Sequence, residues 1–501
     1  NPYNQNTNAT FFDKDWMFGI NDKFDIVIAN PPFVEHKKLK QYSTIYKRQY
    51  ETYSGTADLY VYFYEKGIKL LNPYGVLTFI SSNKFLKTSY GENLREFLTL
   101  RKIEQIIDFT DVHVFEALVA SCIVITSEKK TKSKILVSFA NDELTNFSNL
   151  NEFIKENNLL IEQKTLGKEI WQLESDDKLH VKEQIEKQGK VISSIKSISI
   201  NRGVTTGYNP AFVIENQTRN ELIAEDSKSK EVIKKLLQGR NIKKWVYENS
   251  NEFLIFTRKG INIKLYPAIQ KFLKAFKEKL EPGVGRKPGP YYWYEIQDNT
   301  AYYQDFEKEK IIWGLTADKW AFAYDRQKHY LPSNGYILSS FDIEVKYLLS
   351  LLNSNVLQFY FSFIGIMTAG GAYTLKHETI REMPIVVGDT KSREPFIQLV
   401  DNILAIYKFV NIETEIKDEF EKVLNGCIYE LYFGEEMKKV GVDILALVEK
   451  DLEAVKELPT EKAISTLYEK WQEPKNEIRN RLLLMATRCP DTIGVIEANV
   501  K

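Results

Sequence analysis

Residues 24–33 read Phe-Asp-Ile-Val-Ile-Ala-Asn-Pro-Pro-Phe. The first six are mostly apolar and rich in β-branched side chains, which predicts a buried parallel strand. Pro31 and Pro32 end the strand and stiffen the loop that follows, because proline fixes its own backbone and restricts the preceding residue. Open α/β sheets bind ligands at the carboxyl ends of their strands. The stretch therefore predicts a ligand-binding loop at Asn30.

The chemistry of this loop suits a flat group that has an amine. The Asn30 amide oxygen and the Pro31 carbonyl can accept the two amine hydrogens, while Phe33 stacks on the ring. Pro32 shapes the loop. The alternative is an ordinary strand-to-loop turn in which the asparagine only caps the backbone.

Strand and helix patterns alternate from residue 24 to residue 140, which favours a doubly wound α/β sheet. Gly55 precedes an apolar helix that is expected from about residue 57 to residue 71, and another helix is expected to end near Leu100. Further strands are expected at Val76–Ile80, at Lys102–Phe109, and, as a terminal pair, at Ser121–Thr126 and Ile135–Phe139.

The composition sets limits on the class of protein. The 501 residues are 43% hydrophobic and 27% charged with a formal net charge of zero, and this length predicts about three domains. No apolar run has the length of a membrane span, and no signal peptide is visible. Cys122, Cys427 and Cys489 are scattered, as are the five histidines. We therefore expect no metal site and a reducing, cytoplasmic location without membrane contact.

Residues 25–33, with the pattern Asp-x-x-x-x-Asn-Pro-Pro-aromatic, resemble the catalytic motif of adenine-specific DNA methyltransferases. The resemblance implies that Asn30 and Pro31 hold the exocyclic amine of an adenine flipped out of duplex DNA. Two accepted hydrogen bonds would free the nitrogen lone pair for attack on the methyl group of S-adenosylmethionine. Stacking on Phe33 would offset part of the cost of extruding the base.

Later segments match the same family in order. Residues 55–60, Gly-Thr-Ala-Asp-Leu-Tyr, resemble the segment that opens the next helix, and Pro73-x-Gly-Val-Leu followed by Ser81-Ser-Asn resembles the next strand and its loop. Val114-Phe115 resembles the segment whose aromatic residue closes over the flipped base. Phe115 is thus predicted to lie opposite Phe33. The alternative is a core phenylalanine in a loop.

The cofactor site departs from the family pattern. These methyltransferases bind S-adenosylmethionine with a Gly-rich loop upstream of the catalytic motif, but only 29 residues precede Asn30. We therefore expect this chain to lack the cofactor-binding loop and the first strands of its catalytic domain. Asp15 and Trp16 resemble the acidic and aromatic pair that holds the cofactor adenine. The alternative is a solvated aspartate beside a packing tryptophan.

The region after residue 190 is rich in aromatic residues and resembles the TaqI-like target-recognition domain of type IIG restriction–modification enzymes. Residues 231–330 contain 19 Lys and Arg against 12 Asp and Glu. Basic groups beside aromatic rings suit phosphate contacts and base stacking. The alternative is a solvated helix face over an aromatic core. The predicted contacts to double-stranded DNA are Lys243, Lys244, Arg286, Lys287, Tyr291 and Trp293.

The predicted fold is a partial Rossmann-like methyltransferase sheet, an α+β target-recognition domain and a helical carboxyl-terminal region. The expected divisions are residues 1–140 for the catalytic part, 141–190 for a helical connector, 191–390 for target recognition and 391–501 for the helical region. The predicted function is adenine methylation by a type IIG enzyme. Its full-length parent would add a type II endonuclease, and only that nuclease would need Mg²⁺. A non-catalytic DNA-recognition fragment and a methyltransferase of a nuclease-free phage-defence system are the alternatives.

Overall fold

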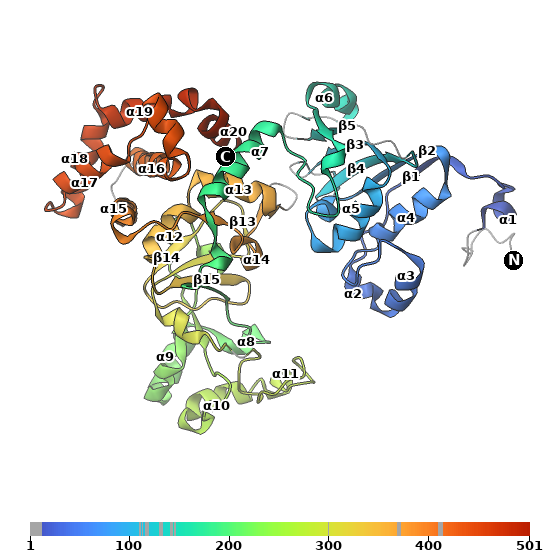
Figure 1. Cartoon of the computed structure of the whole chain (residues 1–501). Helices are drawn as coiled ribbons and strands as arrows, with labels where there is room; N and C mark the ends of the chain where they lie inside the picture. Colours follow the sequence, from blue (N-terminus) through green and yellow to red (C-terminus); the bar gives the residue numbers. More distant parts are fainter. Residues whose placement is uncertain are drawn as a thin grey trace. The chain divides into compact units, whose positions relative to one another are not determined.

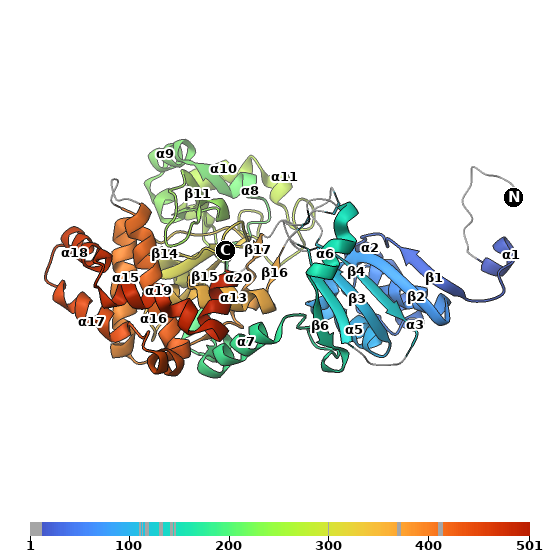
Figure 2. The ribbon, with the colours of Figure 1, turned by 90° about the horizontal axis from the view of Figure 1, so that it is seen from above.

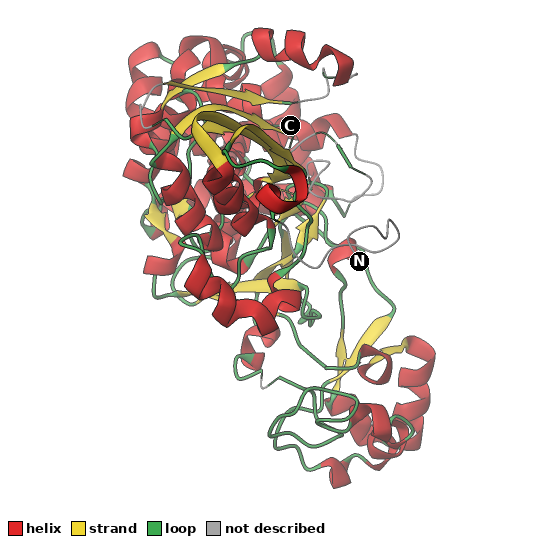
Figure 3. Ribbon diagram, turned by 90° about the vertical axis from the view of Figure 1, so that its right-hand side faces the viewer, coloured by secondary structure: helices red, strands yellow, loops and turns green. Residues whose placement is uncertain are grey.

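The computed structural model describes residues 13–500 except 110–111, 113, 116–119, 130–133, 141–143, 145–146, 299, 368–371 and 409–413. The chain divides into two compact units (Figures 1 and 2). The first contains the described residues of 13–175 together with strand β16 (Ile366–Met367), and the second contains those of 176–365 and 372–500. Figure 3 distinguishes helices, strands and loops by colour.

The first unit is built on a six-stranded sheet in the order β1-β2-β4-β3-β5-β6. Strands β1 and β2 are parallel, with Val27 opposite Leu77, and β3 and β5 are also parallel. Strand β4 runs antiparallel between β2 and β3, and β6 is antiparallel to β5. The strands are β1 (Phe24–Ala29), β2 (Leu71–Ser82), β3 (Lys102–Asp108), β4 (Ser121–Ser127), β5 (Lys134–Phe139) and β6 (Leu159–Glu162).

The predicted alternation of strands and helices is confirmed, but the predicted pairing of Ser121–Thr126 with Ile135–Phe139 is wrong. Strand β4 pairs with β2 and β3 instead, and β5 pairs with β3. Cys122 and Val124 are fully buried in β4. The strand consists of small and apolar residues, and this composition suits the middle of a sheet, where both faces are covered.

Helices α4 and α5, both labelled in Figure 1, cover one face of this sheet. Val27 and Ala29 pack against that core, whereas Ile26 and Ile28 point to the other face and are 63% and 75% exposed. The strand predicted from residues 24–29 is therefore present and parallel, but in the described structure one of its faces is half-buried and the other is exposed. The helices of the first unit are α1 (Lys14–Phe18), α2 (His36–Leu39), η1 (Lys40–Tyr42), α3 (Ser43–Gln49), α4 (Tyr60–Leu70), η2 (Asn83–Leu86), η3 (Ser89–Gly91), α5 (Glu92–Thr99), η4 (Phe147–Asn149), α6 (Leu150–Glu156) and η5 (Gln163–Thr165).

Residues 141–190 differ from the predicted helical connector. They include α6, then the sheet strand β6, and only after these the helix α7 (Asp176–Gln188). Leu159, Leu160 and Ile161 give β6 an apolar run that pairs with β5. Because this run is short and flanked by charged residues, its hydrophobic periodicity does not distinguish a helix from a strand.

The second unit contains a four-stranded sheet in the order β14-β12-β15-β8 and a three-stranded sheet in the order β10-β11-β9. Two short antiparallel pairs, β13 with β17 and β18 with β7, complete its strands. The strands are β7 (Lys190–Val191), β8 (Ile198–Arg202), β9 (Val213–Glu215), β10 (Ile233–Lys235), β11 (Glu252–Ile255), β12 (Lys310–Gly314), β13 (Thr316–Ala317), β14 (Ala323–Asp325), β15 (Gly335–Ser340), β17 (Tyr373–Thr374) and β18 (Pro384–Ile385).

The carboxyl-terminal helices share a hydrophobic core with this sheet. Trp313 of β12, Leu357 of α13 and Trp471 of α18 are all fully buried in it, so residues 391–500 pack as part of the second unit. The helices are α8 (Asn209–Phe212), α9 (Asn216–Glu225), α10 (Pro267–Lys274), α11 (Lys277–Leu280), η10 (Tyr303–Glu307), α12 (Val345–Leu352), α13 (Asn355–Ile364), α14 (His377–Ile380), α15 (Thr390–Ile406), α16 (Thr414–Val440), α17 (Leu445–Ala454), α18 (Thr460–Gln472), α19 (Glu477–Arg488) and α20 (Val495–Asn499).

Candidate functional site

The loop predicted to be catalytic follows β1 directly. Pro31 is buried, whereas Asn30, Pro32 and Phe33 are exposed. The Val34 N–H donates a hydrogen bond of 3.1 Å to the Pro32 carbonyl, which turns the chain after the two prolines. The loop thus presents the Asn30 side chain to solvent from a stiff and partly buried base.

The start of α4 braces this loop. The Leu59 N–H donates to the Val34 carbonyl at 3.0 Å, and the His36 N–H donates to Asp58 Oδ1 at 3.2 Å. Burial raises the pKa of the Asp58 carboxyl, and the His36 N–H and the charge of Lys84 oppose this shift. No role was predicted for Asp58 beyond its place in residues 55–60.

Phe33 and Phe115 lie against each other. Their ring centroids are 6.0 Å apart and the ring planes meet at 66°, an edge-to-face contact. A base stacked between two rings needs them parallel and about 7 Å apart, twice the contact distance between carbon atoms. The predicted pair is therefore close together, and one ring must turn before a base can lie between them.

The ends of β2 and β3 are tied together next to β4. Asn83, which follows β2, donates through Nδ2 to Asp108 Oδ1 at 2.9 Å, and its N–H donates to the Ala120 carbonyl at 3.1 Å.

Burial and the charge of Asp108 raise the pKa of the Cys122 thiol well above its usual value. The thiol therefore stays protonated at neutral pH and does not serve as a nucleophile.

Asp15 and Trp16, the predicted cofactor pair, lie on helix α1. This helix buries none of its residues. Trp16 is 63% exposed, and Asp15 forms an ion pair of 2.7 Å with Lys14. An exposed indole face and a carboxylate are the groups that an adenosine moiety can contact by stacking and through its ribose hydroxyls.

Arg286, predicted to contact DNA, is a structural residue of the second unit. Its side chain is buried, and its five N–H groups point at five backbone carbonyls. Burial lowers the pKa of the guanidinium. The prediction is wrong because a local excess of basic residues does not show which side chains are buried. The accepting carbonyls belong to Thr206, Leu280, Tyr292, Trp293 and Glu295.

Replacing Arg286 by lysine is expected to lower the melting temperature of the protein by several degrees. The lysine ammonium has three N–H groups and no planar fork, so at least two buried carbonyls would lose their partners at roughly 1–3 kcal/mol each. Differential scanning calorimetry measures the change. Arg326→Lys is the matched control, because Arg326 is exposed in the same unit. An equal, small effect of both substitutions would contradict a structural role for Arg286.

Lys244 is also engaged within the fold. It forms an ion pair of 2.7 Å with Glu421, which accepts a second hydrogen bond of 2.8 Å from the Trp245 indole. Lys243 is exposed and lies 3.8 Å from Glu248. Lys244 thus joins the recognition part to helix α16.

The loop after Arg286 keeps the other predicted DNA contacts nearer the surface. Lys287 is exposed, and Tyr291 and Trp293 are half-buried. The Arg286 guanidinium lies 4.6 Å from the centroid of the Tyr291 ring, and Lys277 lies 5.8 Å from that of Trp293. These three side chains remain candidates for DNA contact.

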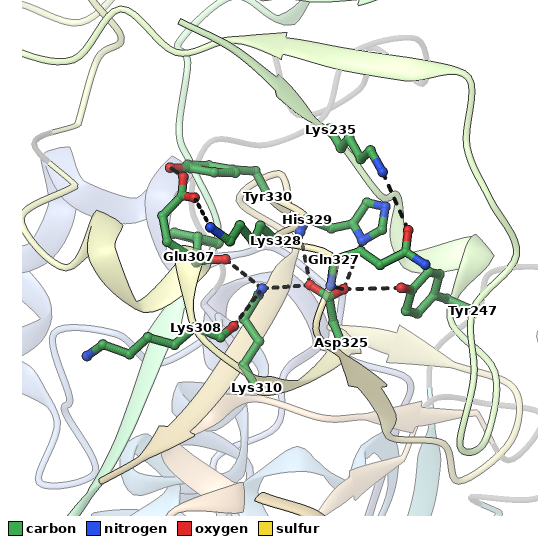
Figure 4. Close-up of polar contacts among 11 residues, drawn as sticks. Lys235, Tyr247, Glu307, Lys308, Lys310, Asp325, Gln327, Lys328, His329 and Tyr330 are labelled. Atoms are coloured by element: carbon green, nitrogen blue, oxygen red, sulfur yellow. Dashed lines mark hydrogen bonds and ion pairs between the residues drawn. The ribbon is translucent and has the colours of Figure 1, made fainter. Parts of the chain in front are cut away.

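A buried ionic cluster, which the sequence analysis missed, links β12 and β14 (Figure 4). Lys310 and Asp325 are completely buried and form an ion pair of 2.6 Å. Asp325 also accepts hydrogen bonds from the Tyr247 hydroxyl at 3.2 Å and from His329 N–H and Nδ1, each at 2.9 Å. The hydrogen bond from His329 and the charge of Lys310 hold the pKa of Asp325 well below its usual value, against the effect of burial. Burial lowers the pKa of Lys310.

Two kinds of feature are absent from the described residues. No three His, Cys, Asp or Glu side chains among them are grouped as metal ligands would be. No helix among them is long and apolar enough to cross a membrane.

Two family models match this chain. Residues 2–115, which include the Asn30 loop, match the Eco57I restriction-modification methylase, and residues 234–385 match the TaqI-like C-terminal specificity domain. The type II methyltransferase M.BstVI of Geobacillus stearothermophilus is 24% identical over 80% of this chain and 76% of its own length. The type II restriction enzyme and methyltransferase RM.Eco57I of Escherichia coli is 22% identical over 85% of this chain and 46% of its own length.

In these family matches and relatives, the chain resembles the type IIG restriction–modification methyltransferases. The predicted order of a methyltransferase part followed by a TaqI-like recognition domain is confirmed. Among solved structures, the type IIL restriction-modification enzyme MmeI in complex with DNA superposes with a TM-score of 0.53 at 13% identity, over 93% of this chain and 57% of that one. This likeness supports the α/β fold of this chain.

Proposed function

We propose that this chain transfers a methyl group to the exocyclic amine of an adenine flipped out of a specific site in duplex DNA. The observation that carries the proposal is the Asn30–Phe33 loop. It exposes Asn30 at the carboxyl end of a parallel strand, is braced by the start of α4, and contacts Phe115 through Phe33. Strand ends of this kind are where open α/β sheets hold their ligands.

The loop groups have separate roles. The Asn30 amide oxygen and the Pro31 carbonyl accept the two amine hydrogens, which draws the nitrogen toward tetrahedral geometry and frees its lone pair. Pro32 holds the turn. Phe33 and Phe115 move from edge-to-face contact to parallel faces, and the base stacks between them.

S-adenosylmethionine is the proposed cofactor, and when bound it supplies the methyl group. Asp15 and Trp16 suit only its adenosine end, through the carboxylate and the exposed indole face.

The second unit is proposed to read the DNA duplex. Residues 234–385 match a specificity domain, and Lys243, Lys287, Tyr291 and Trp293 are the candidate contacts. Restriction activity is a further proposal for a full-length protein, because RM.Eco57I is by name both a restriction enzyme and a methyltransferase and this chain spans 46% of its length. Mg²⁺ would be needed by that nuclease alone. We place the activity in the cytoplasm.

The test of the proposal is the identity of the methylated base. Full-length protein is incubated with plasmid DNA and S-adenosylmethionine, and the DNA is digested to nucleosides for mass spectrometry. N6-methyladenine is expected, together with increased fluorescence when 2-aminopurine replaces the target base and is unstacked. A product methylated only on cytosine, or no methylated product, would contradict the adenine assignment.

A further inference from the structure

The segment that follows the candidate active-site loop is strongly basic. Residues 36–50 contain five Lys and Arg and no Asp or Glu, in a chain whose net charge is zero. The segment folds into α2, η1 and α3, and all five cationic side chains are exposed. We call this set the basic platform; it consists of Lys37, Lys38, Lys40, Lys47 and Arg48.

The platform cations have no anionic partner among the described residues. Across the part of the chain that the structure describes, none of the five forms an ion pair or a side-chain hydrogen bond, whereas Lys244 and Lys310 both pair with carboxylates. A cluster of like charges without partners destabilises the compact state by self-repulsion. An external polyanion would relieve that repulsion and gain the charge interactions that the fold itself leaves unmade.

The helices beneath these cations are fixed to the rest of the unit. Tyr46 and Tyr50 lie against Tyr62 of α4, with ring centroids 4.7 and 5.2 Å apart, and Leu39 is buried. A hollow of about 290 Å³ opens between these helices and the turn before α4, and Lys40 is among the residues that line it. The helices that present the cations are therefore anchored to α4, and Lys40 lies beside a preformed hollow.

The platform begins close to the site of the proposed chemistry. Lys37 is four residues from Phe33, so their Cα atoms are at most about 14 Å apart. One strand of B-DNA advances about 3.4 Å per nucleotide, so this span corresponds to roughly four nucleotides. A duplex whose adenine reaches Asn30 would have its backbone within reach of the platform.

We propose that the basic platform binds backbone phosphates of the DNA beside the flipped adenine, an inference that rests on the proposed function. Its contacts would be to phosphates and would position the duplex without reading its sequence. Holding the flanking backbone would compensate part of the cost of unpairing and unstacking the target base.

The salt dependence of DNA binding tests the platform. Full-length protein and its Lys37→Gln/Lys38→Gln/Lys40→Gln variant are titrated with a fluorescent mixed-sequence duplex between roughly 50 and 200 mM salt. Loss of three phosphate contacts should reduce the slope of log K against log salt by about 2–3 and weaken binding roughly tenfold or more at the low end of this range. Lys47→Gln/Arg48→Gln should reduce the slope by about 2.

The matched control is Lys450→Gln/Lys462→Gln/Lys475→Gln, which removes three exposed lysines from the carboxyl-terminal helices. An unchanged slope of log K against log salt in the platform variants, or an equal reduction of the slope in the control, would refute phosphate binding by the platform. If cytosine were the only methylated base, the adenine assignment would be refuted, but the platform proposal would not. A reduction of the slope in the platform variants alone would still show that the basic platform contacts phosphates.

Discussion

Replacement of Asn30 by alanine in the full-length protein is expected to reduce methyl transfer by roughly two to three orders of magnitude. The amide oxygen of Asn30 is one of two proposed acceptors for the amine, and loss of one such preorganised group costs about 10²–10³ in rate. Asn30 is exposed, so its truncation should leave the fold intact. Single-turnover transfer of labelled methyl groups measures the loss, and binding of the specific duplex should change by less than about threefold, because affinity depends mainly on phosphate contacts.

Asn21→Ala is the matched control for this experiment. Asn21 is an exposed asparagine before the same strand, at the end opposite to the loop, and its loss should not alter the rate. Asn30→Asp retains an acceptor oxygen and should keep more activity than the alanine variant. If Asn30→Ala transferred methyl groups at the unmodified rate, the catalytic role of the loop would be refuted.

The sequence predicted the strand and loop at residues 24–33 well because their signals are local. A run of β-branched residues favours a strand, and two prolines end it regardless of what packs nearby. The burial of each side chain, in contrast, depends on which distant segments pack against the strand. Ile26 and Ile28 are exposed because the described elements cover only the face of β1 that contains Val27.

Strand order and side-chain burial could not be predicted from the same signals. The insertion of β4 between β2 and β3 depends on contacts between distant segments, which a pattern of alternating elements does not contain. Arg286 and Lys37 illustrate the same limit. Both are basic residues near aromatic ones, yet Arg286 is enclosed by five carbonyls and Lys37 is exposed. Counting charges along the chain therefore predicted DNA contacts in residues 231–330 but none in residues 36–50.

The brace at Asp58 shows what a resemblance adds and what it omits. Matching residues 55–60 to a family segment located the start of α4 next to the loop. It did not show that Asp58 accepts the His36 N–H or that Leu59 donates to Val34. These bonds connect residues more than twenty positions apart, and only the folded chain brings their donors and acceptors together.

Asp325→Ala is expected to destabilise the protein by about 3–5 kcal/mol, because removal of one member of a buried ion pair leaves the other charge without a partner. The stranded charge is the Lys310 ammonium, which is completely buried. Denaturant unfolding followed by tyrosine and tryptophan fluorescence measures the loss. Asp318→Ala is the control, since Asp318 is exposed a few residues before β14. Comparable stability of the two variants would contradict a structural role for the cluster.

The ion pair also fixes the direction of the pH dependence. The pKa of Asp325 is lowered in the folded state, so its contribution to stability is fully present above the unfolded value, near about 4, and is lost as the pH falls below it toward the folded value. The unmodified protein should therefore lose stability more steeply than Asp325→Ala on acidification below about pH 4. Lys310→Met/Asp325→Leu should recover part of the stability that Asp325→Ala loses, because it leaves no unpaired ammonium. Failure of the double variant to exceed the single one would show that the hydrogen bonds from Tyr247 and His329, rather than Lys310, account for the effect of Asp325.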